Sequence, residues 1–195
     1  MSPERADGRR LKGERRRRAI LDAALRVVER DGVAGVSHRA IAREAGVPPA
    51  SIAYYFAGID ELLVATLVES ADLLVGDIAR MRERTPPEGR AWVRTIAENL
   101  AMMIDERRAR TIAEYELYLL AARRPALRPA ARRWFEIATG EVDRAVDVDP
   151  AAIKAVLAAI DGLLLQALIA EHPPGADDFE PALRHLLRPV LADDG

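Results

Sequence analysis

Hydrophobic residues recur at intervals of three and four along most of the chain, and no stretch alternates between hydrophobic and polar residues as a strand would. Alanine, leucine, arginine and glutamate, all strong helix formers, are abundant. The pattern therefore predicts an all-α protein of about nine helices. The expected helices are residues 15–30, 38–45, 49–56, 60–84, 88–106, 109–123, 126–146, 150–171 and 178–192.

Two short helices joined by a tight turn are expected close to the N-terminus. Ser37 suits the N-cap of the first, because a hydroxyl can accept a hydrogen bond from a backbone N–H. Gly46 ends that helix, and Pro49 suits the first position of the next, where a missing N–H costs nothing. Together with the helix at 15–30, which Gly32 closes, they predict a three-helix unit that contains a helix-turn-helix.

The helix expected at 150–171 is hydrophobic on nearly all sides, which is more than one core-facing stripe requires. A second buried face is implied, and another subunit is the simplest cover for it. The final helix could complete a four-helix interface about a two-fold axis, so a homodimer is expected. The residues predicted at this interface are Ile160, Leu164, Leu168, Leu183 and Leu187.

Charge divides the chain near residue 60. Residues 1–60 hold 12 Lys and Arg against 8 Asp and Glu, a net charge of +4, whereas the remainder holds 17 against 23, a net charge of −6. A basic end suits contact with phosphates, and an acidic body keeps the rest of the chain off nucleic acid. The predicted organisation is a basic disordered arm at 1–14, a helix-turn-helix domain at 15–60 and a helical body at 61–195.

Composition argues against several classes of protein and site. The chain has no cysteine, which removes disulfides, thiol nucleophiles and Cys-ligated metals and fits a reducing compartment. The three histidines are isolated, and no Gly-rich phosphate loop or nucleophile elbow occurs, so neither an enzyme nor a cofactor is expected. The N-terminus is too charged for a signal peptide, and charged residues interrupt the most hydrophobic window, 151–170. A soluble cytoplasmic protein without a membrane segment is therefore expected.

One run of residues near the N-terminus fixes four helices, their caps and their spacing over about 50 residues. It comprises Ile20 to Ala24, Asp31 and Gly32, Ser37 to Val47, Ile52, Tyr54, Phe56 and Glu61 to Leu63. In this run the chain resembles the tetracycline-repressor (TetR) type regulators. The remainder resembles that family only in its length, its helical character and the stretch Asp161 to Leu163.

The resemblance implies that residues 37–56 dock in the major groove of a double-stranded DNA operator. Arg39 could pair with guanine or clamp a phosphate, or it could be an ordinary exposed arginine. Tyr54 and Tyr55 occupy places where family members contact phosphate and thymine methyl groups, although Tyr55 could equally pack under the first helix. The residues expected to contact DNA are Arg15, Arg16, Ser37, His38, Arg39, Pro49, Ala50, Ser51, Tyr54 and Tyr55.

The helix at 49–56 departs from the family pattern. Pro48 stands where a capping Ser or Thr is usual, and Ala53 replaces a frequent tyrosine. Ile59 stands where many relatives carry a phosphate-binding lysine. Direct base reading by this helix is therefore expected to be weak. Eight Lys and Arg residues in the first 18 positions could compensate by contacting phosphates or a minor groove.

The resemblance also implies a small-molecule effector, with residues 61–195 acting as a ligand-binding and dimerisation domain. A bound ligand would tilt the helix at 60–84 and change the spacing of the two DNA-binding heads. Large flexible or aromatic side chains suit such a pocket, although each could instead be plain core. The predicted pocket residues are Trp92, Met102, Met103, Tyr115, Tyr118, Trp134 and Phe135. Glu114 and Glu116 could face a cationic ligand or form an ordinary charged helix face.

The predicted function is that of a ligand-responsive transcriptional regulator. By family resemblance it is a repressor that a small molecule releases from its operator. An enzyme is one alternative, and a helical interaction module that has lost DNA binding is another. The plain helix at 49–56 keeps the second alternative open.

Overall fold

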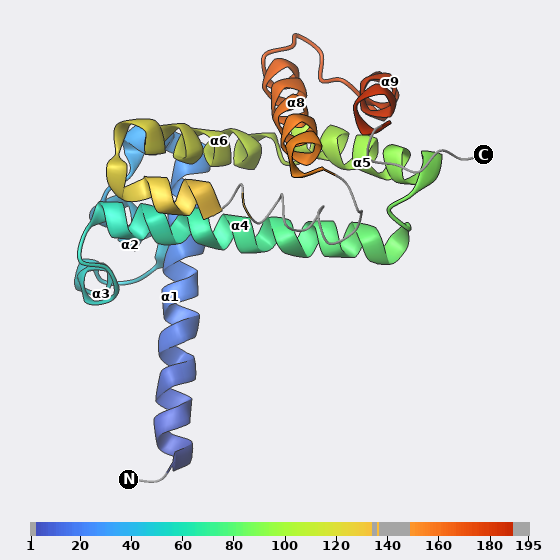
Figure 1. Ribbon diagram of the computed structural model, residues 1–195. Helices are drawn as coiled ribbons and strands as arrows, with labels where there is room; N and C mark the ends of the chain where they lie inside the picture. The colour runs from blue at the N-terminus through green and yellow to red at the C-terminus, as the bar shows by residue number, and fades with distance from the viewer. Residues whose placement is uncertain (1–2, 134–135, 137–148, 189–195) are drawn as a thin grey trace. The chain divides into compact units, whose positions relative to one another are not determined.

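The computed structural model describes residues 3–133, 136 and 149–188, and these residues form helices and turns without a strand. The predicted all-α class is confirmed (Figure 1). The predicted helix at 126–146 lies largely outside the described residues, apart from a helical stretch at 128–133. The α-helices with described bounds are α1 (Pro3–Asp31), α2 (His38–Ala45), α3 (Pro49–Tyr55), α4 (Ile59–Arg84), α5 (Gly89–Ile104), α6 (Arg108–Arg123), α8 (Pro150–Leu168) and α9 (Ala176–Leu187). Two short 3-10 helices follow α1 and α6, namely η1 (Val33–Gly35) and η2 (Pro125–Leu127).

The first helix is longer than the sequence pattern indicated. It begins at Pro3 rather than at Arg15, so the arm that was expected to be disordered at 1–14 is helical from its third residue. Once a helix is nucleated, each further residue adds one hydrogen bond, and this segment is rich in arginine and other good helix formers. Gly8 and Gly13 do not interrupt it.

The chain divides into two compact units. The first consists of residues 1–70 together with 112–131, and the second of residues 71–111 together with 132–195. α4 and α6 therefore each pass from one unit to the other. The functional domain boundary at residue 60 stays a prediction, because compact units and functional domains need not have the same limits.

In the first unit, α1, α2, α3 and the start of α4 share one core. α3 contributes Ile52, and the residue that follows the helix, Phe56, is 1% exposed. Burying one large hydrophobic side chain stabilises a fold by about 1.5–3 kcal/mol, so this core holds the two short helices firmly on α1. The buried residues of this core are Ile20, Leu21, Ala23, Ala24, Val27, Ile41, Ala42, Ile52, Phe56 and Leu62.

In the second unit, α5 packs mainly on α9 and also on α8. The buried residues of α5 recur at intervals of four and three, as a helix with one inward face requires: Val93, Ala97, Leu100 and Ile104. Arg94 of α5 also forms ion pairs with two acidic residues of α9. Hydrophobic packing and charge pairing thus join the same two helices.

The packing of α8 and α9 within the chain buries most residues of the predicted subunit interface. Leu183 and Leu187 of α9 are 0% and 5% exposed, and Leu164 and Leu168 of α8 are 4% and 9% exposed. Ile160, the fifth predicted interface residue, is partly buried. Residues buried within the chain offer little surface to a second subunit, and the predicted interface stays a prediction.

Among the described residues, one face of α8 nevertheless carries exposed hydrophobic side chains. Leu165 is 43% exposed and Ile169, directly after the helix, is 85% exposed. The window Ala151–Leu168 is long and apolar enough to cross a membrane, and 22% of it is buried within the chain. The exposed or half-exposed residues on this face alternate in spacing between four and three, as in a coiled-coil seam: Ala151, Ala155, Ala158, Gly162, Leu165 and Ile169.

Candidate nucleic-acid interface

Backbone geometry at both ends of α2 fixes the helix-turn-helix. At the start, the Ser37 hydroxyl accepts a hydrogen bond from the Ala40 N–H at 3.1 Å, as its predicted capping role requires. At the end, Gly46 has a φ of 64°, and the Val47 N–H donates to the Ala42 carbonyl at 3.0 Å. A side chain would strain this left-handed position, which explains the glycine.

α3 begins without a side-chain cap. Pro48 precedes it, and the Ser51 N–H donates to the Pro48 carbonyl at 2.8 Å. Pro49 occupies the first helical position, as predicted. At the other end the Phe56 N–H donates to the Ile52 carbonyl at 2.9 Å, and both of these side chains are buried. The buried side anchors α3 and leaves the opposite side to solvent.

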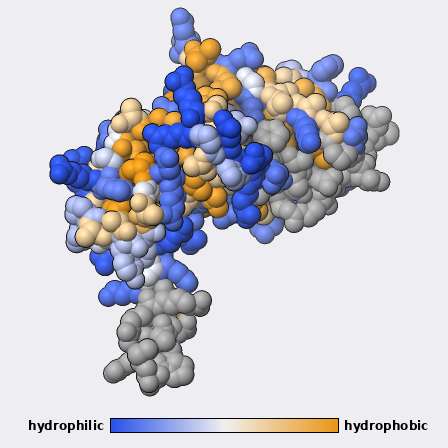
Figure 2. All heavy atoms as spheres, turned by 60° about the vertical axis from the view of Figure 1, so that its left-hand side comes forward, coloured by the Kyte–Doolittle hydropathy of each residue, from blue (hydrophilic) through white to orange (hydrophobic). Residues whose placement is uncertain are grey.

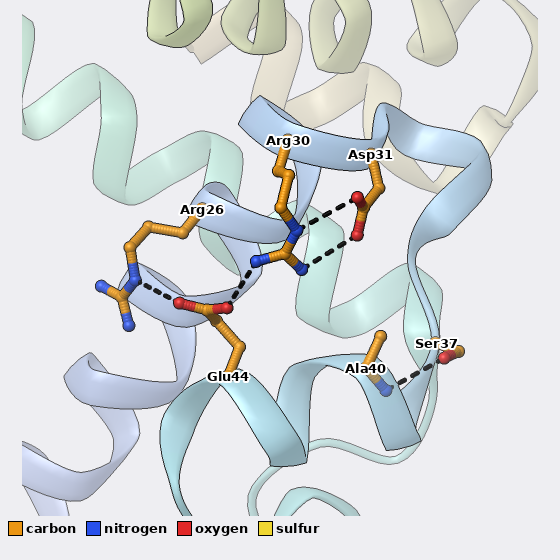
Figure 3. Close-up of polar contacts among 6 residues, drawn as sticks. All are labelled: Arg26, Arg30, Asp31, Ser37, Ala40 and Glu44. Atoms are coloured by element: carbon orange, nitrogen blue, oxygen red, sulfur yellow. Dashed lines mark hydrogen bonds and ion pairs between the residues drawn. The ribbon is translucent and has the colours of Figure 1, made fainter.

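Charged residues connect α1 to α2 (Figure 3). Glu44 accepts hydrogen bonds from Arg26 Nε and Arg30 Nη1, both at 2.8 Å. Arg30 also donates to Asp31 through Nε at 3.1 Å and Nη2 at 2.9 Å. The hydrogen bonds from Arg26 and Arg30 hold the pKa of Glu44 below its ordinary value, and the hydrogen bond from Arg30 does the same for the pKa of Asp31. Both carboxylates are therefore ionised at neutral pH; Glu44 holds α2 against α1, and Asp31 pairs with Arg30 within α1.

The predicted DNA-contacting residues of α2 and the start of α3 are mostly at the surface. Arg39, Pro49 and Ala50 are exposed. Ser37 is exposed as well, although its hydroxyl is engaged as the helix cap. His38 is half-buried, and its Nε2 atom is buried without a hydrogen-bond partner among the residues that the structure describes.

The two tyrosines of α3 have different surroundings. Tyr54 is 82% exposed, whereas Tyr55 is half-buried against the core that α1, α2, α3 and the start of α4 share. These four segments are called the head below. Their rings meet edge to face with centroids 5.0 Å apart. A Cβ atom at Gly13 of α1 would lie 3.8 Å from the Tyr55 hydroxyl oxygen. Tyr55 thus packs beside α1, and Tyr54 is the tyrosine presented to solvent. Ser51, on the same helix, is half-buried.

Four consecutive arginines of α1, Arg15 to Arg18, are all exposed, but two of them have partners within the protein. Arg15 and Arg16 are exposed. The Arg17 guanidinium lies 5.2 Å from the centre of the Phe56 ring, a cation–π distance, and Arg18 forms an ion pair at 2.9 Å with a glutamate of α4. Arg17 and Arg18 therefore have contacts with other parts of the chain, whereas no such contact is described for Arg15 and Arg16.

One exposed arginine was not among the predicted residues. Arg43 lies one turn after Arg39 on α2 and is exposed on the same side of the helix. The spacing of four between the two arginines is visible in the sequence and could have identified it.

The last turns of α6 belong to the same unit as the helix-turn-helix. Glu116 Oε2 accepts a hydrogen bond from the Val33 N–H at 2.8 Å, and a Cβ atom at Gly32 would lie 3.2 Å from the same oxygen. Arg124, directly after α6, forms an ion pair at 2.7 Å with Asp60, which lies at the start of α4. The sequence suggested a ligand or a charged helix face for Glu116, and the structure places it against η1 instead.

The predicted pocket residues lie on two helices as far as they are described. Those on α5 and α6 are all partly buried: Trp92, Met102, Met103, Tyr115 and Tyr118. Trp134 and Phe135 lie outside the described residues. Within the described part of the chain, no group of three or more His, Cys, Asp or Glu side chains could hold a metal ion.

Two family models match the chain. Residues 20–66 match the bacterial regulatory proteins of the tetR family, and residues 89–191 match the tetracyclin repressor-like C-terminal domain. The two matches cover the helix-turn-helix and most of the helical body.

Individual relatives show the same similarity. The HTH-type transcriptional regulator BetI of Brucella anthropi is 30% identical over 170 residues, which cover 83% of this chain and 86% of that protein. The nicotine-responsive repressor HdnoR of Paenarthrobacter nicotinovorans is 35% identical over 115 residues, so the match spans 56% of this chain and 56% of that repressor. A crystal structure of the multidrug binding protein EbrR with ethidium is 37% identical, with a TM-score of 0.75 and coverage of 88% of this chain and 97% of that one.

The geometry of the head agrees with these similarities. A glycine turn joins two short helices, and the exposed side of this pair carries Arg39, Arg43 and Tyr54. The body is helical in its described part and matches the family's C-terminal domain. The chain therefore belongs to the tetR family of bacterial regulatory proteins and is a DNA-binding transcriptional regulator of the helix-turn-helix type.

Proposed function

We propose that the protein is a repressor that binds a double-stranded DNA operator as a homodimer and leaves it when a small molecule binds. The observation that carries this proposal is the exposed side of α2 and α3, where Arg39, Arg43 and Tyr54 reach solvent while the opposite side is buried. A short helix pair bordered by arginines suits a major groove and its phosphates. Because its target is DNA, we infer a cytoplasmic location.

The proposed contacts divide by chemistry. Arg39 pairs with a guanine edge or a phosphate, and the Tyr54 hydroxyl donates to a phosphate. Arg15 and Arg16, exposed on α1, add phosphate contacts. The helical start of α1 extends the same basic surface, since Lys12 is exposed as well. Tyr55 packs beside α1 and supports α3, so we expect no contact between Tyr55 and DNA.

A second copy of the chain is the proposed cover for the exposed face of α8, which carries Leu165 and Ile169. Small residues occupy the four earlier positions of that face, so two such helices could approach closely. A two-fold dimer places two recognition helices against one side of DNA, where half-sites lie about 34 Å apart. Dimerisation would thus match the protein to a palindromic operator.

The proposed effector is an aromatic cation. EbrR has been crystallised with ethidium, proflavin and malachite green, which are aromatic cations, and HdnoR responds to nicotine. In this chain Tyr115 and Tyr118 supply partly buried aromatic rings on α6. Such rings attract cations through their π faces, and Glu114 adds a carboxylate beside Tyr115. A ligand of this kind would shift operator affinity only if it binds the DNA-free arrangement more tightly.

The proposal is tested by gel retardation with the DNA upstream of the protein's own gene, first alone and then with malachite green. We expect a specific protein–DNA complex that dissociates when malachite green is added. Tyr115→Ala and Tyr118→Ala are matched variants that should bind the same DNA and resist release, which separates effector binding from any effect of the dye on DNA. A dye that stabilises the protein against heat but leaves operator affinity unchanged would refute the proposed coupling.

A further inference from the structure

The exposed side of α3 is made of small and apolar side chains. Pro49, Ala50, Ala53 and Tyr54 are exposed, and the Tyr54 hydroxyl is the one polar group that their side chains carry. In Figure 2, where the left-hand side of Figure 1 has come forward, pale atoms of intermediate hydropathy lie near the lower edge of the coloured surface and border dark blue hydrophilic ones. The exposed strip of α3, Pro49, Ala50, Ala53 and Tyr54, therefore presents few polar atoms to solvent.

The chemistry of this strip limits what it can recognise in a major groove. Guanine is read by paired donors that meet O6 and N7, adenine by an amide that meets N6 and N7, and cytosine by an acceptor for its amino group. Pro49, Ala50 and Ala53 offer none of these groups. Thymine differs, because it presents a C5 methyl group that apolar side chains contact directly.

The residues around this strip favour DNA as its binding partner. Arg39 and Arg43 lie on α2, the neighbouring helix of the motif, and both are exposed. Arg15 and Arg16 are exposed on α1. Cationic side chains on two neighbouring helices suit DNA, whose phosphates border the groove that presents the base edges.

We propose that α3 reads thymine methyl groups through Pro49, Ala50 and Ala53, so that the base pairs beneath α3 in each half-site are A·T pairs. Guanine recognition then falls to Arg39 on α2. The inference rests on the proposed operator binding and names the base chemistry that this surface selects.

The test begins with selection of binding duplexes from a random DNA library by the purified full-length protein. Each thymine of the selected half-site is then replaced by uracil, which keeps base pairing and removes only the methyl group. We expect affinity to fall about fourfold for each methyl that α3 covers, from the transfer free energy of one buried carbon. Thymines outside the α3 footprint should show no change.

Protein variants assign the effect to α3. Ala50→Ser and Ala53→Ser place a hydroxyl in the strip and should reduce the thymine-to-uracil affinity ratio at one position each. Ala122→Ser, an exposed alanine of α6, is the matched control and should leave every ratio unchanged. If selection enriches no duplex, the proposed DNA binding fails and this inference fails with it. If a duplex is enriched but uracil replacement changes nothing, or the two α3 variants keep the wild-type ratios, the inference alone is overturned.

Discussion

The Glu116 carboxylate accepts a hydrogen bond from the Val33 N–H at 2.8 Å and so joins α6 to the turn that follows α1. Val33 opens the 3-10 helix η1, and the first N–H groups of a helix have no partner inside it. A carboxylate is a strong acceptor for such a group. The contact therefore stabilises the entry to α2 from a segment that lies 83 positions later in the chain.

Glu116→Ala should lower the free energy of unfolding by about 1–3 kcal/mol, because a partly buried N–H loses its acceptor. Glu116→Gln keeps a carbonyl oxygen and should cost less. Urea denaturation measures both values. Glu106→Ala, at an exposed position between α5 and α6, serves as the control and should unfold like the wild type. Equal stability of Glu116→Ala and the wild type would contradict a role for this bond.

Glu44→Gln should destabilise the head at neutral pH but not in acid. The pKa of Glu44 is lowered in the folded state, so its stabilising effect is complete above the ordinary glutamate pKa of about 4.3 and is lost as the pH falls through the folded value. Unfolding curves of the variant and the wild type should therefore converge below that range. A stability difference that persists unchanged at low pH would point to packing instead of charge.

Arg39→Ala should relax the preference at one base position by about 1–3 kcal/mol if the guanidinium reads guanine. Uniform weakening on every sequence would assign Arg39 to a phosphate. Arg43→Ala, one turn along the same face, is the matched comparison. Fluorescence anisotropy on a set of single-base operator variants separates the two patterns, and wild-type binding by Arg39→Ala would exclude any contact.

Deletion of residues 2–14 should weaken binding to all DNA sequences and flatten the slope of log affinity against log salt. Each phosphate contact releases counterions, so losing basic residues reduces that slope by close to one per lost contact. Titrations between about 50 and 200 mM salt provide the measurement. An unchanged slope would show that the helical start of α1 stays clear of DNA.

Leu165→Glu combined with Ile169→Glu should convert the dimer to a monomer, since a charge in an apolar interface is costly to bury. Both side chains are exposed in the single chain, so its fold should survive. Light scattering reports the mass. Leu119→Glu, at an exposed position of α6 (60%), is the control and should remain dimeric. A dimer that withstands both charges would place the interface elsewhere.

Local signals in the sequence predicted the helix-turn-helix well. Ser37, Gly46 and Pro49 act on backbone groups within a few residues of themselves, so their effect can be recognised without a structure. The start of α1 was missed because its first turns carry no hydrophobic stripe, and an exposed helix leaves no such pattern.

Other features depend on contacts that a sequence does not reveal. α8 is hydrophobic on two faces, and periodicity cannot tell that Leu164 lies in the core while its neighbour Leu165 faces outward. The bond between Glu116 and Val33 joins distant segments and has no local pattern. The DNA contacts and the effector pocket remain predictions from residue chemistry and family similarity.

The composition of the first unit also sets the order in which the molecule can fold. Residues 112–131 are part of that unit, and residue 131 follows residue 70 by 61 positions. At about 5–20 residues per second, the ribosome needs roughly 3–12 s to add them. Until then the Val33 N–H lacks Glu116 and the Asp60 carboxylate lacks Arg124. The DNA-binding head is encoded first in the chain, yet it is completed only after half of the regulatory body has been synthesised.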